Sequence, residues 1–236
     1  MIKAVVTGHT RGLGAAVAAQ LLARGIAVLG LARGHAEGGE GMEQASVDLG
    51  DGAALAAWLQ GDTLRRFLAG CDTALLVNNA GVVSPVGPLA QQDPLAALRA
   101  ATINVAAPLA LAAAFVQAAP QAQRRIVHVS SGAARNAYPG WSVYCATKAA
   151  LDQHARAVAL DADPRVLACS LAPGVIDTDM QAEIRATPDA RFPLRQRFVD
   201  LKEGGDLVAP SQCAAALVDY LLGAGFGQQA VDDLRN

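Results

Sequence analysis

A glycine-rich turn between a short strand and a helix is the feature that most restricts the fold. Residues 2–7 (IKAVVT) are typical of a buried strand, residues 8–14 (GHTRGLG) form the turn, and residues 15–24 are an alanine-rich helix that stops at Gly25. Glycines let the backbone approach a phosphate, and the helix N-terminus adds N–H donors and the positive end of its dipole. The spacing is Gly-x-x-x-Gly-x-Gly, not the Gly-x-Gly-x-x-Gly of long-chain dehydrogenases. We therefore predict a phosphate-binding turn.

Strands and helices alternate along the rest of the chain. We expect further strands at residues 26–31, 44–47, 74–77, 126–129, 165–171 and 229–231, and helices at 53–68 (interrupted at Gly61), 94–116, 142–162 and 214–222. Residues 34–43 are expected to form a loop, and the irregular segment 175–207 to form a lid. The alternation predicts an α/β chain in which residues 1–236 form one domain, a single-domain Rossmann fold with a doubly wound parallel sheet of about seven strands.

Charge and composition restrict the possible partners. The net charge of −2 gives no reason to expect a nucleic-acid partner. The chain passes from Met1 directly into a strand, so we expect no signal peptide, and no apolar run is expected to reach the ~18 residues that span a bilayer. Cysteines 71, 145, 169 and 213 are far apart and lack metal-ligand spacing, which favours reduced thiols, no metal site and a cytoplasmic location.

The stretch from Arg124 to Lys148 carries the candidate chemistry. A buried strand ends at Ser130 and Ser131, a Gly/Pro-rich connection follows, and Tyr144 and Lys148 then stand four residues apart in an expected helix. Residues at i and i+4 share one helix face, and a nearby ammonium favours the phenolate, so we predict that Lys148 lowers the pKa of Tyr144. A serine hydroxyl from the strand end is placed to hold a carbonyl oxygen.

Arginines near the second strand bear on the choice of coenzyme. An acidic residue at that strand end would bind the ribose 2′-hydroxyl of NAD, whereas an arginine accommodates a 2′-phosphate. Arg33 stands there, and we expect Arg11 in the glycine turn to reach the same phosphate. The pair favours NADP(H). Asn104, inside an Ala/Leu helix, is interpreted either as locally bonded to backbone or as part of a water relay.

Together these residues resemble the short-chain dehydrogenase/reductase family over essentially the whole chain. The resemblance rests on motifs in the family's order: Thr7-Gly8-x-x-x-Gly12-x-Gly14, Asp48, Asn78-Asn79-Ala80-Gly81, Asn104, Ser131, Tyr144-x-x-x-Lys148 and Pro173-Gly174-x-x-x-Thr178. The family's serine lies 13 positions before its tyrosine, which selects Ser131 over Ser130. The runs VSSGAARNAYPGWSVYCATKAA, LAPGVIDTDMQAEIR and RFVDLKEGGDLVAP are most similar to benzil reductases, which are akin to sepiapterin reductases, whereas the first sixty residues are less similar.

The resemblance implies roles for individual residues. Tyr144 would protonate a carbonyl oxygen as hydride arrives, Lys148 would bind the nicotinamide ribose, Ser131 would position the carbonyl, and Asn104 would hold a water. The coenzyme would be bound by Gly8, Thr10, Arg11, Gly12, Leu13 and Gly14 at its phosphates, by Asp48 and Leu49 at adenine, by Asn79, Ala80 and Gly81 at the adenine-side ribose, and by Pro173, Gly174, Val175, Ile176 and Thr178 at the carboxamide.

The expected substrate is a compact aromatic ketone or diketone in an apolar pocket. Candidate lining residues are Tyr138, Trp141, Met180, Phe192 and Phe198. Alternatively, Trp141 and the two phenylalanines only pack the lid onto the body. A sepiapterin-type pterin ketone, with Asp232 as an anchor, and a 3-oxoacyl-carrier-protein are alternative substrates, and a silent NADPH-binding regulator is the non-enzyme alternative. Cys145, beside Tyr144, has no assigned role. The helices at 94–116 and 142–162 are apolar on several sides, and in relatives they pair two-fold, so a homodimer or homotetramer is expected.

Overall fold

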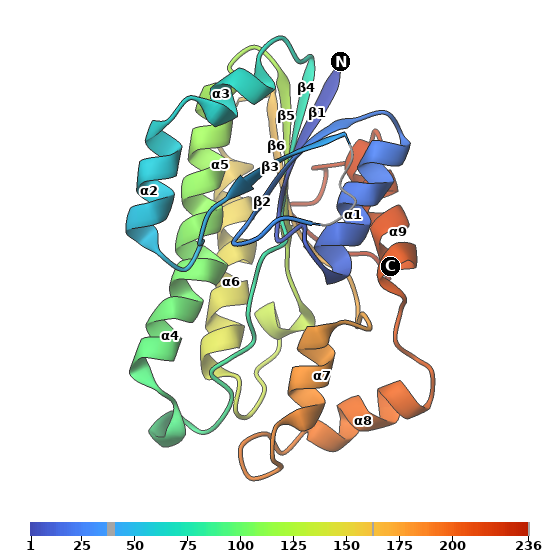
Figure 1. The fold of residues 1–236 in the computed structure, drawn as a ribbon. Coiled ribbons are helices and arrows are strands. Elements are labelled where there is room, and N and C mark those ends of the chain that lie inside the picture. The colour runs from blue at the N-terminus through green and yellow to red at the C-terminus, as the bar shows by residue number, and fades with distance from the viewer. Residues whose placement is uncertain (37–40, 162, 236) are drawn as a thin grey trace.

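The computed structural model describes residues 1–36, 41–161 and 163–235, and within them a sheet lies between two layers of helices (Figure 1). Its seven strands follow the order β3-β2-β1-β4-β5-β6-β7, and every neighbouring pair is parallel. Their bounds are β1 Ile2–Thr7, β2 Ala27–Ala32, β3 Met42–Ser46, β4 Thr73–Asn78, β5 Gln123–Val129, β6 Val166–Ala172 and β7 Val231–Asp233. The predicted doubly wound Rossmann fold is confirmed.

Helices cover both faces of the sheet (Figure 1). One face carries α1 (Gly12–Ala23) and α9 (Pro210–Leu222), and the other carries α2 (Gly52–Gln60), α3 (Thr63–Leu68), α4 (Pro94–Ala101), α5 (Ala107–Ala118) and α6 (Ser142–Val158). Each face has its own apolar core: Leu21 and Leu217 pack on the first, Leu111 and Phe115 on the second. Two short 3-10 segments, η1 (Leu89–Gln91) and η3 (Gly132–Ala134), lie in the connections.

The sheet topology determines where a ligand can bind. β1 and β4 are neighbours in register, with Val6 opposite Val77, but the chain leaves them toward different edges of the sheet. In open α/β sheets such a switch point leaves a crevice outside the carboxyl ends of the strands. The glycine turn follows β1 directly, so this crevice begins at the predicted phosphate-binding turn.

The helix expected over 94–116 changes character at its centre. Between α4 and α5 the chain makes a π-helical segment, η2 (Thr102–Ala106), which contains the buried Asn104. Single π turns inside α-helices are frequent at functional sites. By length and composition, Pro94–Ala118 is apolar enough to cross a membrane, with a mean hydropathy of 1.6, so the prediction that no run approaches that length is wrong. In this fold α5 packs on the sheet through Leu111 and Phe115.

The segment 175–207 is more regular than its sequence suggests. It holds two helices, α7 (Asp179–Ala186) and α8 (Arg195–Glu203), which lie below the carboxyl edge of the sheet (Figure 1). Each buries only a few side chains, among them Ile184 and Phe198, so neither has the apolar stripe that predicts a helix from sequence.

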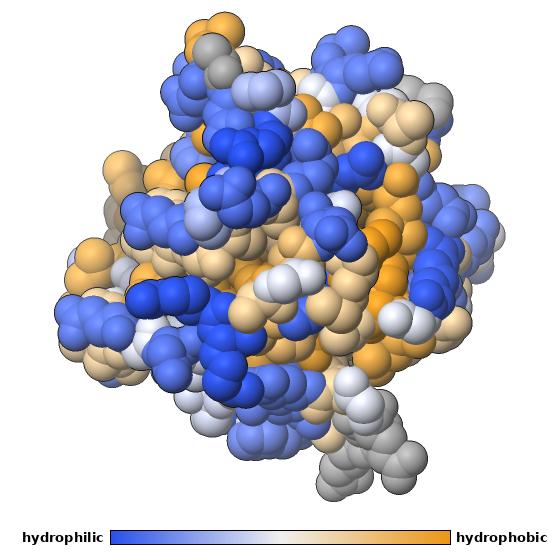
Figure 2. Space-filling model, turned by 90° about the horizontal axis from the view of Figure 1, so that it is seen from above, coloured by the Kyte–Doolittle hydropathy of each residue, from blue (hydrophilic) through white to orange (hydrophobic). Residues whose placement is uncertain are grey.

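Smaller differences concern the ends of elements. The helix expected to reach residue 162 ends at Val158, and the last strand is two residues later than expected, at Val231–Asp233. Residues 37–40 of the expected loop and residue 162 lie outside the described part of the chain. Seen from above the view of Figure 1, the surface is a mosaic in which apolar areas lie between hydrophilic ones (Figure 2).

Candidate active site

One cavity of about 690 Å³ at the carboxyl edge of the sheet collects most of the predicted site residues. Its size is that of a small-molecule site. The predicted residues that line it are Gly8, Thr10, Arg11, Gly12, Leu13, Arg33, Asp48, Leu49, Asn79, Ala80, Gly81, Ser131, Tyr138, Trp141, Tyr144, Lys148, Pro173, Gly174, Val175, Ile176, Thr178, Met180 and Phe198. Segments far apart in the sequence therefore meet around one space.

The glycine turn needs its glycines for two different reasons. Gly8 and Gly12 have φ angles of 69° and 55°, which side chains other than glycine rarely adopt. Gly14 instead lies behind the turn, where a Cβ atom would stand 2.1 Å from the carbonyl oxygen of Gly8. The turn is therefore pressed against the first turn of α1, whose free N–H groups face the cavity edge. This close-packed cradle fits a pyrophosphate.

Contacts between β1 and β4 hold that turn in place. The Thr7 hydroxyl accepts hydrogen bonds from the backbone N–H groups of Asn79 and Ala80, each at 3.0 Å. The Asn79 amide in turn donates to the Thr7 carbonyl at 2.9 Å. The Asn-Asn-Ala-Gly motif thus fixes the spacing of the two strand ends that flank the switch point.

Arginines surround the expected adenine end. Arg33 lies at the end of β2, exposed and facing the cavity. Arg11 pairs with Asp179 at 2.9 Å across the surface. Arg99, which sequence reasoning missed, donates to both carboxylate oxygens of Asp48, at 2.9 and 3.1 Å, and this bond is the largest of the effects that lower the pKa of Asp48. No local signal identifies Arg99, because it comes from α4 and meets Asp48 only in the fold.

Tyr144, Lys148 and Ser131 converge on the middle of the cavity. Tyr144 and Lys148 lie one turn apart on α6 and are almost fully buried. The Lys148 ammonium donates to the Val129 carbonyl at 2.7 Å and lies 5.7 Å from the centre of the Tyr144 ring. Ser131 follows the end of β5 and caps η3, where its hydroxyl accepts from the Ala133 N–H at 3.2 Å. The predicted trio is thus brought together.

Burial dominates the acid–base properties of this trio. It raises the pKa of Tyr144 to about 12, and the Ser131 side chain opposes this shift. Burial also lowers the pKa of Lys148 to about 8, while Asp152 acts in the opposite direction. The prediction that Lys148 lowers the pKa of Tyr144 below its usual value is therefore wrong for this structure, because removing the phenol from water has the larger effect. Tyr144 remains a protonated donor at neutral pH.

The Asn104 side chain is hydrogen-bonded to other protein groups. Its amide nitrogen donates to the Val82 carbonyl at 2.8 Å and to the Thr147 hydroxyl at 3.1 Å, and its oxygen accepts from the Val82 N–H at 2.9 Å. The expected bond to backbone is confirmed, but its partner is Val82, 22 residues away, and not a local group. The water relay stays a prediction. Gly81 lies close to the side chains of both Asn104 and Lys148. A Cβ atom added to Gly81 would lie 3.3 Å from the Asn104 oxygen and 3.6 Å from the Lys148 nitrogen.

An aromatic cluster forms the substrate side of the cavity. Trp141 stacks on Phe192 with ring centres 4.7 Å apart, and its other neighbours are Tyr144 at 5.3 Å, Phe198 at 5.4 Å and Tyr138 at 5.5 Å. Of these residues, Phe192 is not in contact with the cavity: it is fully buried behind Trp141 and supports the indole. The expectation that Phe192 lines the pocket is therefore wrong. The segment around Arg191 packs so closely against Gly140 that a Cβ atom added there would lie 2.5 Å from the Arg191 carbonyl oxygen.

The helices α7 and α8 add lining residues that the sequence did not indicate. Gln181 and Ile184 come from α7, and Arg197 and Leu201 come from α8. They were missed because the two helices that carry them were not expected.

Two further candidates are engaged elsewhere. Asp232 accepts from the Tyr220 hydroxyl at 2.8 Å and from the Asp233 N–H at 2.8 Å, and it is not among the described lining residues. The Cys145 thiol donates to the Asn136 carbonyl at 3.6 Å. Neither residue is among the described ones that line the cavity.

Comparisons with known proteins agree with this geometry. The family model described as short chain dehydrogenase matches residues 3–189, so the chain belongs to the short-chain dehydrogenase/reductase family. The benzil reductase ((S)-benzoin forming) of Bacillus cereus is 32% identical, with 96% of each chain covered. The sepiapterin reductase of Meriones unguiculatus is 34% identical over 92% of this chain and 90% of its own. The crystal structure of a short-chain dehydrogenase/reductase from Burkholderia vietnamiensis has a TM-score of 0.72 and 49% identity, covering 100% of this chain and 97% of that one.

Family membership and site geometry together define the general activity. The chain is an oxidoreductase that acts on the alcohol/carbonyl couple, and the family binds NAD(P)(H). The protein binds and orients, whereas the hydride chemistry belongs to the coenzyme.

Proposed function

We propose that this protein is an NADPH-dependent carbonyl reductase for compact aromatic ketones and diketones. The observation that carries the proposal is the aromatic wall beside the reacting groups, with Trp141 next to Tyr144 and with Tyr138, Met180 and Phe198 on the same cavity. Small-molecule sites are largely apolar and place a few polar groups where the chemistry occurs. The likeness to benzil reductases supports the same substrate class.

The chain's own residues provide orientation and a proton. When bound, NADPH supplies the hydride. Tyr144 stays protonated at neutral pH, because burial holds its pKa near 12, and donates its proton to the carbonyl oxygen. Ser131 holds the same oxygen by a hydrogen bond, and Lys148 provides positive charge near the phenol. The aromatic wall excludes water from the reacting carbonyl.

The preference for NADPH rests on Arg33. It faces the cavity at the end of β2, the position where an acidic residue would favour NAD. Arg11 is a second candidate, since its pairing with the exposed Asp179 is a surface ion pair of about 0–1 kcal/mol that a phosphate displaces at little cost.

Assembly and location are part of the proposal. Leu95 and Leu98 on α4 are 75% and 66% exposed, which supports a homodimer or homotetramer built through this region. Light scattering at micromolar concentration checks this, and a monomer mass contradicts it. Free thiols at all four cysteines support a cytoplasmic location.

Side-by-side turnover tests the substrate. We expect NADPH oxidation to be fastest with benzil, slower with sepiapterin and slowest with an acetoacetyl thioester. Asp232→Ala serves as the discriminating variant. The Asp232 carboxylate is bonded to Tyr220, so we expect this substitution to leave benzil reduction unchanged. A wild type that hardly reduces benzil and loses sepiapterin reduction with Asp232→Ala contradicts the proposal in favour of a pterin.

A further inference from the structure

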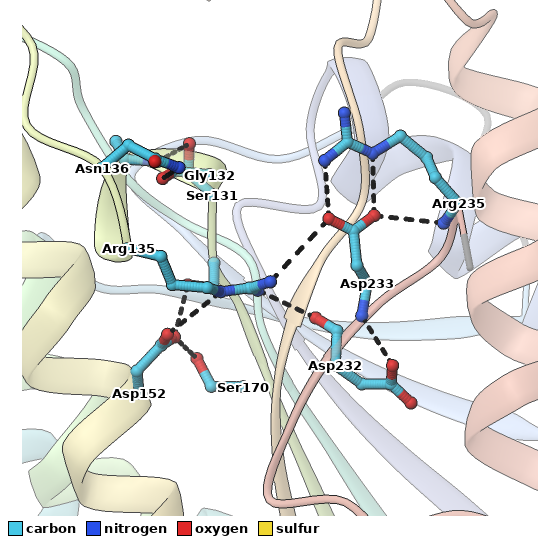
Figure 3. A network of polar contacts seen from close by, with 11 residues as sticks. Ser131, Gly132, Arg135, Asn136, Asp152, Ser170, Asp232, Asp233 and Arg235 are labelled. Atoms are coloured by element: carbon cyan, nitrogen blue, oxygen red, sulfur yellow. Dashed lines mark hydrogen bonds and ion pairs between the residues drawn. The ribbon is translucent and has the colours of Figure 1, made fainter.

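A buried carboxylate one helical turn beyond Lys148 has no part in the mechanism above. Asp152 is 2% exposed and lies on α6 four residues after Lys148. One of its oxygens accepts from two serine hydroxyls, at 2.8 Å from Ser130, which directly follows β5, and at 2.7 Å from Ser170 on β6 (Figure 3 shows the bond to Ser170). Burying a charged group costs free energy unless hydrogen bonds or an opposite charge compensate for the lost water. The two hydroxyl donors provide such compensation for Asp152.

These contacts fix the chain immediately before Ser131. Lys148 holds the Val129 carbonyl, and Asp152 holds the Ser130 hydroxyl, so one face of α6 holds two consecutive residues at the end of β5. Ser131 is the next residue. Its position at the cavity therefore depends on the face of α6 that also carries Tyr144.

Arg135 connects the same carboxylate to the C-terminal strand (Figure 3). Its Nε atom lies 3.5 Å from the second oxygen of Asp152, its Nη2 atom donates to the Asp232 carbonyl at 3.0 Å, and its Nη1 atom lies 3.9 Å from Asp233. Asp233 is paired in turn with Arg235, at 2.6 Å. Asp152 is thus the innermost charge of a chain of alternating charges that runs from the surface to α6.

We propose that Asp152 is a positioning residue for the reaction, which anchors the Ser131 turn and acts as the buried counter-charge that keeps Lys148 cationic. The inference rests on the roles proposed for Tyr144 and Lys148. Burial lowers the pKa of Lys148, and among the charges around it Asp152 opposes that shift. Without Asp152, Lys148 loses its proton at a lower pH, and the positive charge beside the phenol is lost there.

The surrounding charges determine the sign of each test. Asp152 raises the pKa of Lys148, and His128 on β5 is held neutral because burial lowers its pKa to about 3. Other ionisable groups near the site, among the described residues, include Arg135 after η3, Asp233 on β7 and Tyr144 on α6. Cys169 on β6 is another, and its pKa is raised to about 11, mainly by burial. Arg135 is therefore the second cation beside Asp152, and its removal leaves Lys148 as the partner of this carboxylate.

Direct titration of Lys148 tests the proposal without any substrate. Lys3, Lys148 and Lys202 are the chain's lysines, so lysine labelled with ¹³C at Cε gives a spectrum that Lys3→Arg and Lys202→Arg assign. We expect Asp152→Asn, which keeps the shape of the side chain, to lower the titration midpoint of Lys148 by about one pH unit, the low end for an opposite charge nearby. Asp219→Asn, which removes an aspartate from an exposed ion pair with Arg24, is the matched control and should not move it. An unchanged midpoint in Asp152→Asn overturns the proposal.

A second variant, with an expected shift of the Lys148 midpoint in the opposite direction, tests the proposal even if Asp152→Asn does not fold. Arg135 is partly exposed, and Arg135→Gln should raise the midpoint of Lys148, because the carboxylate loses its other cation. A lowered or unchanged midpoint there contradicts the account.

Activity distinguishes a charge effect from simple support of the fold. The alkaline limb of kcat/KM should move to lower pH in Asp152→Asn by the same amount as the NMR midpoint, whereas Ser170→Ala should reduce the rate without moving the limb. If the alkaline limb of kcat/KM does not shift with the NMR midpoint of Lys148, Asp152 does not act on catalysis through Lys148. If the proposed substrate is not reduced, the NMR titration still tests the effect of Asp152 on Lys148.

Discussion

The two halves of the cavity are built in different ways. The coenzyme half is formed by backbone, with Gly8, Gly12 and Gly14 in one short turn and Thr7 bonded to the Asn79 segment. The substrate half is formed by side chains from three separate segments, and Trp141 packs against both Phe192 and Phe198, which also contact each other. A backbone cradle allows few substitutions, whereas a wall of packed aromatic rings can change its shape through single residues. We infer that the first half sets the class of reaction and the second half sets the substrate.

Replacing the proton donor should give the largest effect and separate chemistry from binding in both halves. Tyr144→Phe keeps the ring that packs on Trp141 and removes the hydroxyl. We expect a loss of at least ~10²-fold in kcat, the low end for general acid catalysis. NADPH affinity, measured by coenzyme fluorescence, should remain. Near-normal turnover would exclude Tyr144 as the acid.

Filling the cradle should disrupt the coenzyme half through its backbone. In Gly14→Ala the added methyl meets the Gly8 carbonyl oxygen at 2.1 Å, so the turn must move. We expect a loss of folding stability at the upper end of the range of about 1–3 kcal/mol for overpacking, together with weakened coenzyme binding. Gly52→Ala is the matched control, since its Cβ atom meets nothing within 4 Å. Equal denaturation midpoints for the two variants would contradict the close-packed cradle.

Removing Arg33 should change the coenzyme preference and leave the substrate half alone. A charge-assisted hydrogen bond contributes roughly 1.5–3 kcal/mol. Arg33→Ala should therefore weaken NADPH binding about tenfold or more and spare NADH. Titration of both coenzymes by fluorescence provides the measurement, and a wild type that already prefers NADH makes the assignment wrong.

Removing the indole should act only on the substrate half, and more weakly. Trp141→Ala removes aromatic contacts that contribute about 0.5–1.5 kcal/mol each beyond simple burial. We expect kcat/KM for benzil to fall about fivefold and NADPH affinity to stay unchanged. A change in NADPH affinity of the same size would show that the two halves are not separate.

Prediction from sequence succeeded where local patterns determine structure. The glycine turn and the parallel sheet follow from spacing and alternation, and the shared helix face of Tyr144 and Lys148 follows from their i, i+4 spacing. The choice of Ser131 over Ser130 rests on the family resemblance. The structure brings these residues to one cavity. The helices α7 and α8 were missed because each is short and buries little. The direction of the Tyr144 pKa shift was wrong because the degree of burial of a phenol does not show in the sequence.

Contacts between distant segments account for the rest. Arg99 meets Asp48 across 51 residues, and the Asp152 carboxylate binds both Ser130, which follows β5, and Ser170 on β6. Phe192 supports Trp141 and does not line the cavity, because Gly140, which has no side chain, lets the backbone at Arg191 pack closely against it. Each of these arrangements depends on which segments the fold brings together, and no pattern in a single stretch of sequence indicates it.

A double-mutant cycle tests most directly the claim that the coenzyme half and the substrate half of the cavity act independently. We would measure kcat/KM for benzil, at a fixed subsaturating NADPH concentration, in the wild type, Arg33→Ala, Trp141→Ala and the double variant. Changes at distant, independent sites add within about 0.3–0.5 kcal/mol, so the fold-losses of the single variants should multiply to within about twofold. A double variant that departs from this product by about tenfold would contradict the account, because it would mean that the aromatic wall and the coenzyme cradle act as one unit.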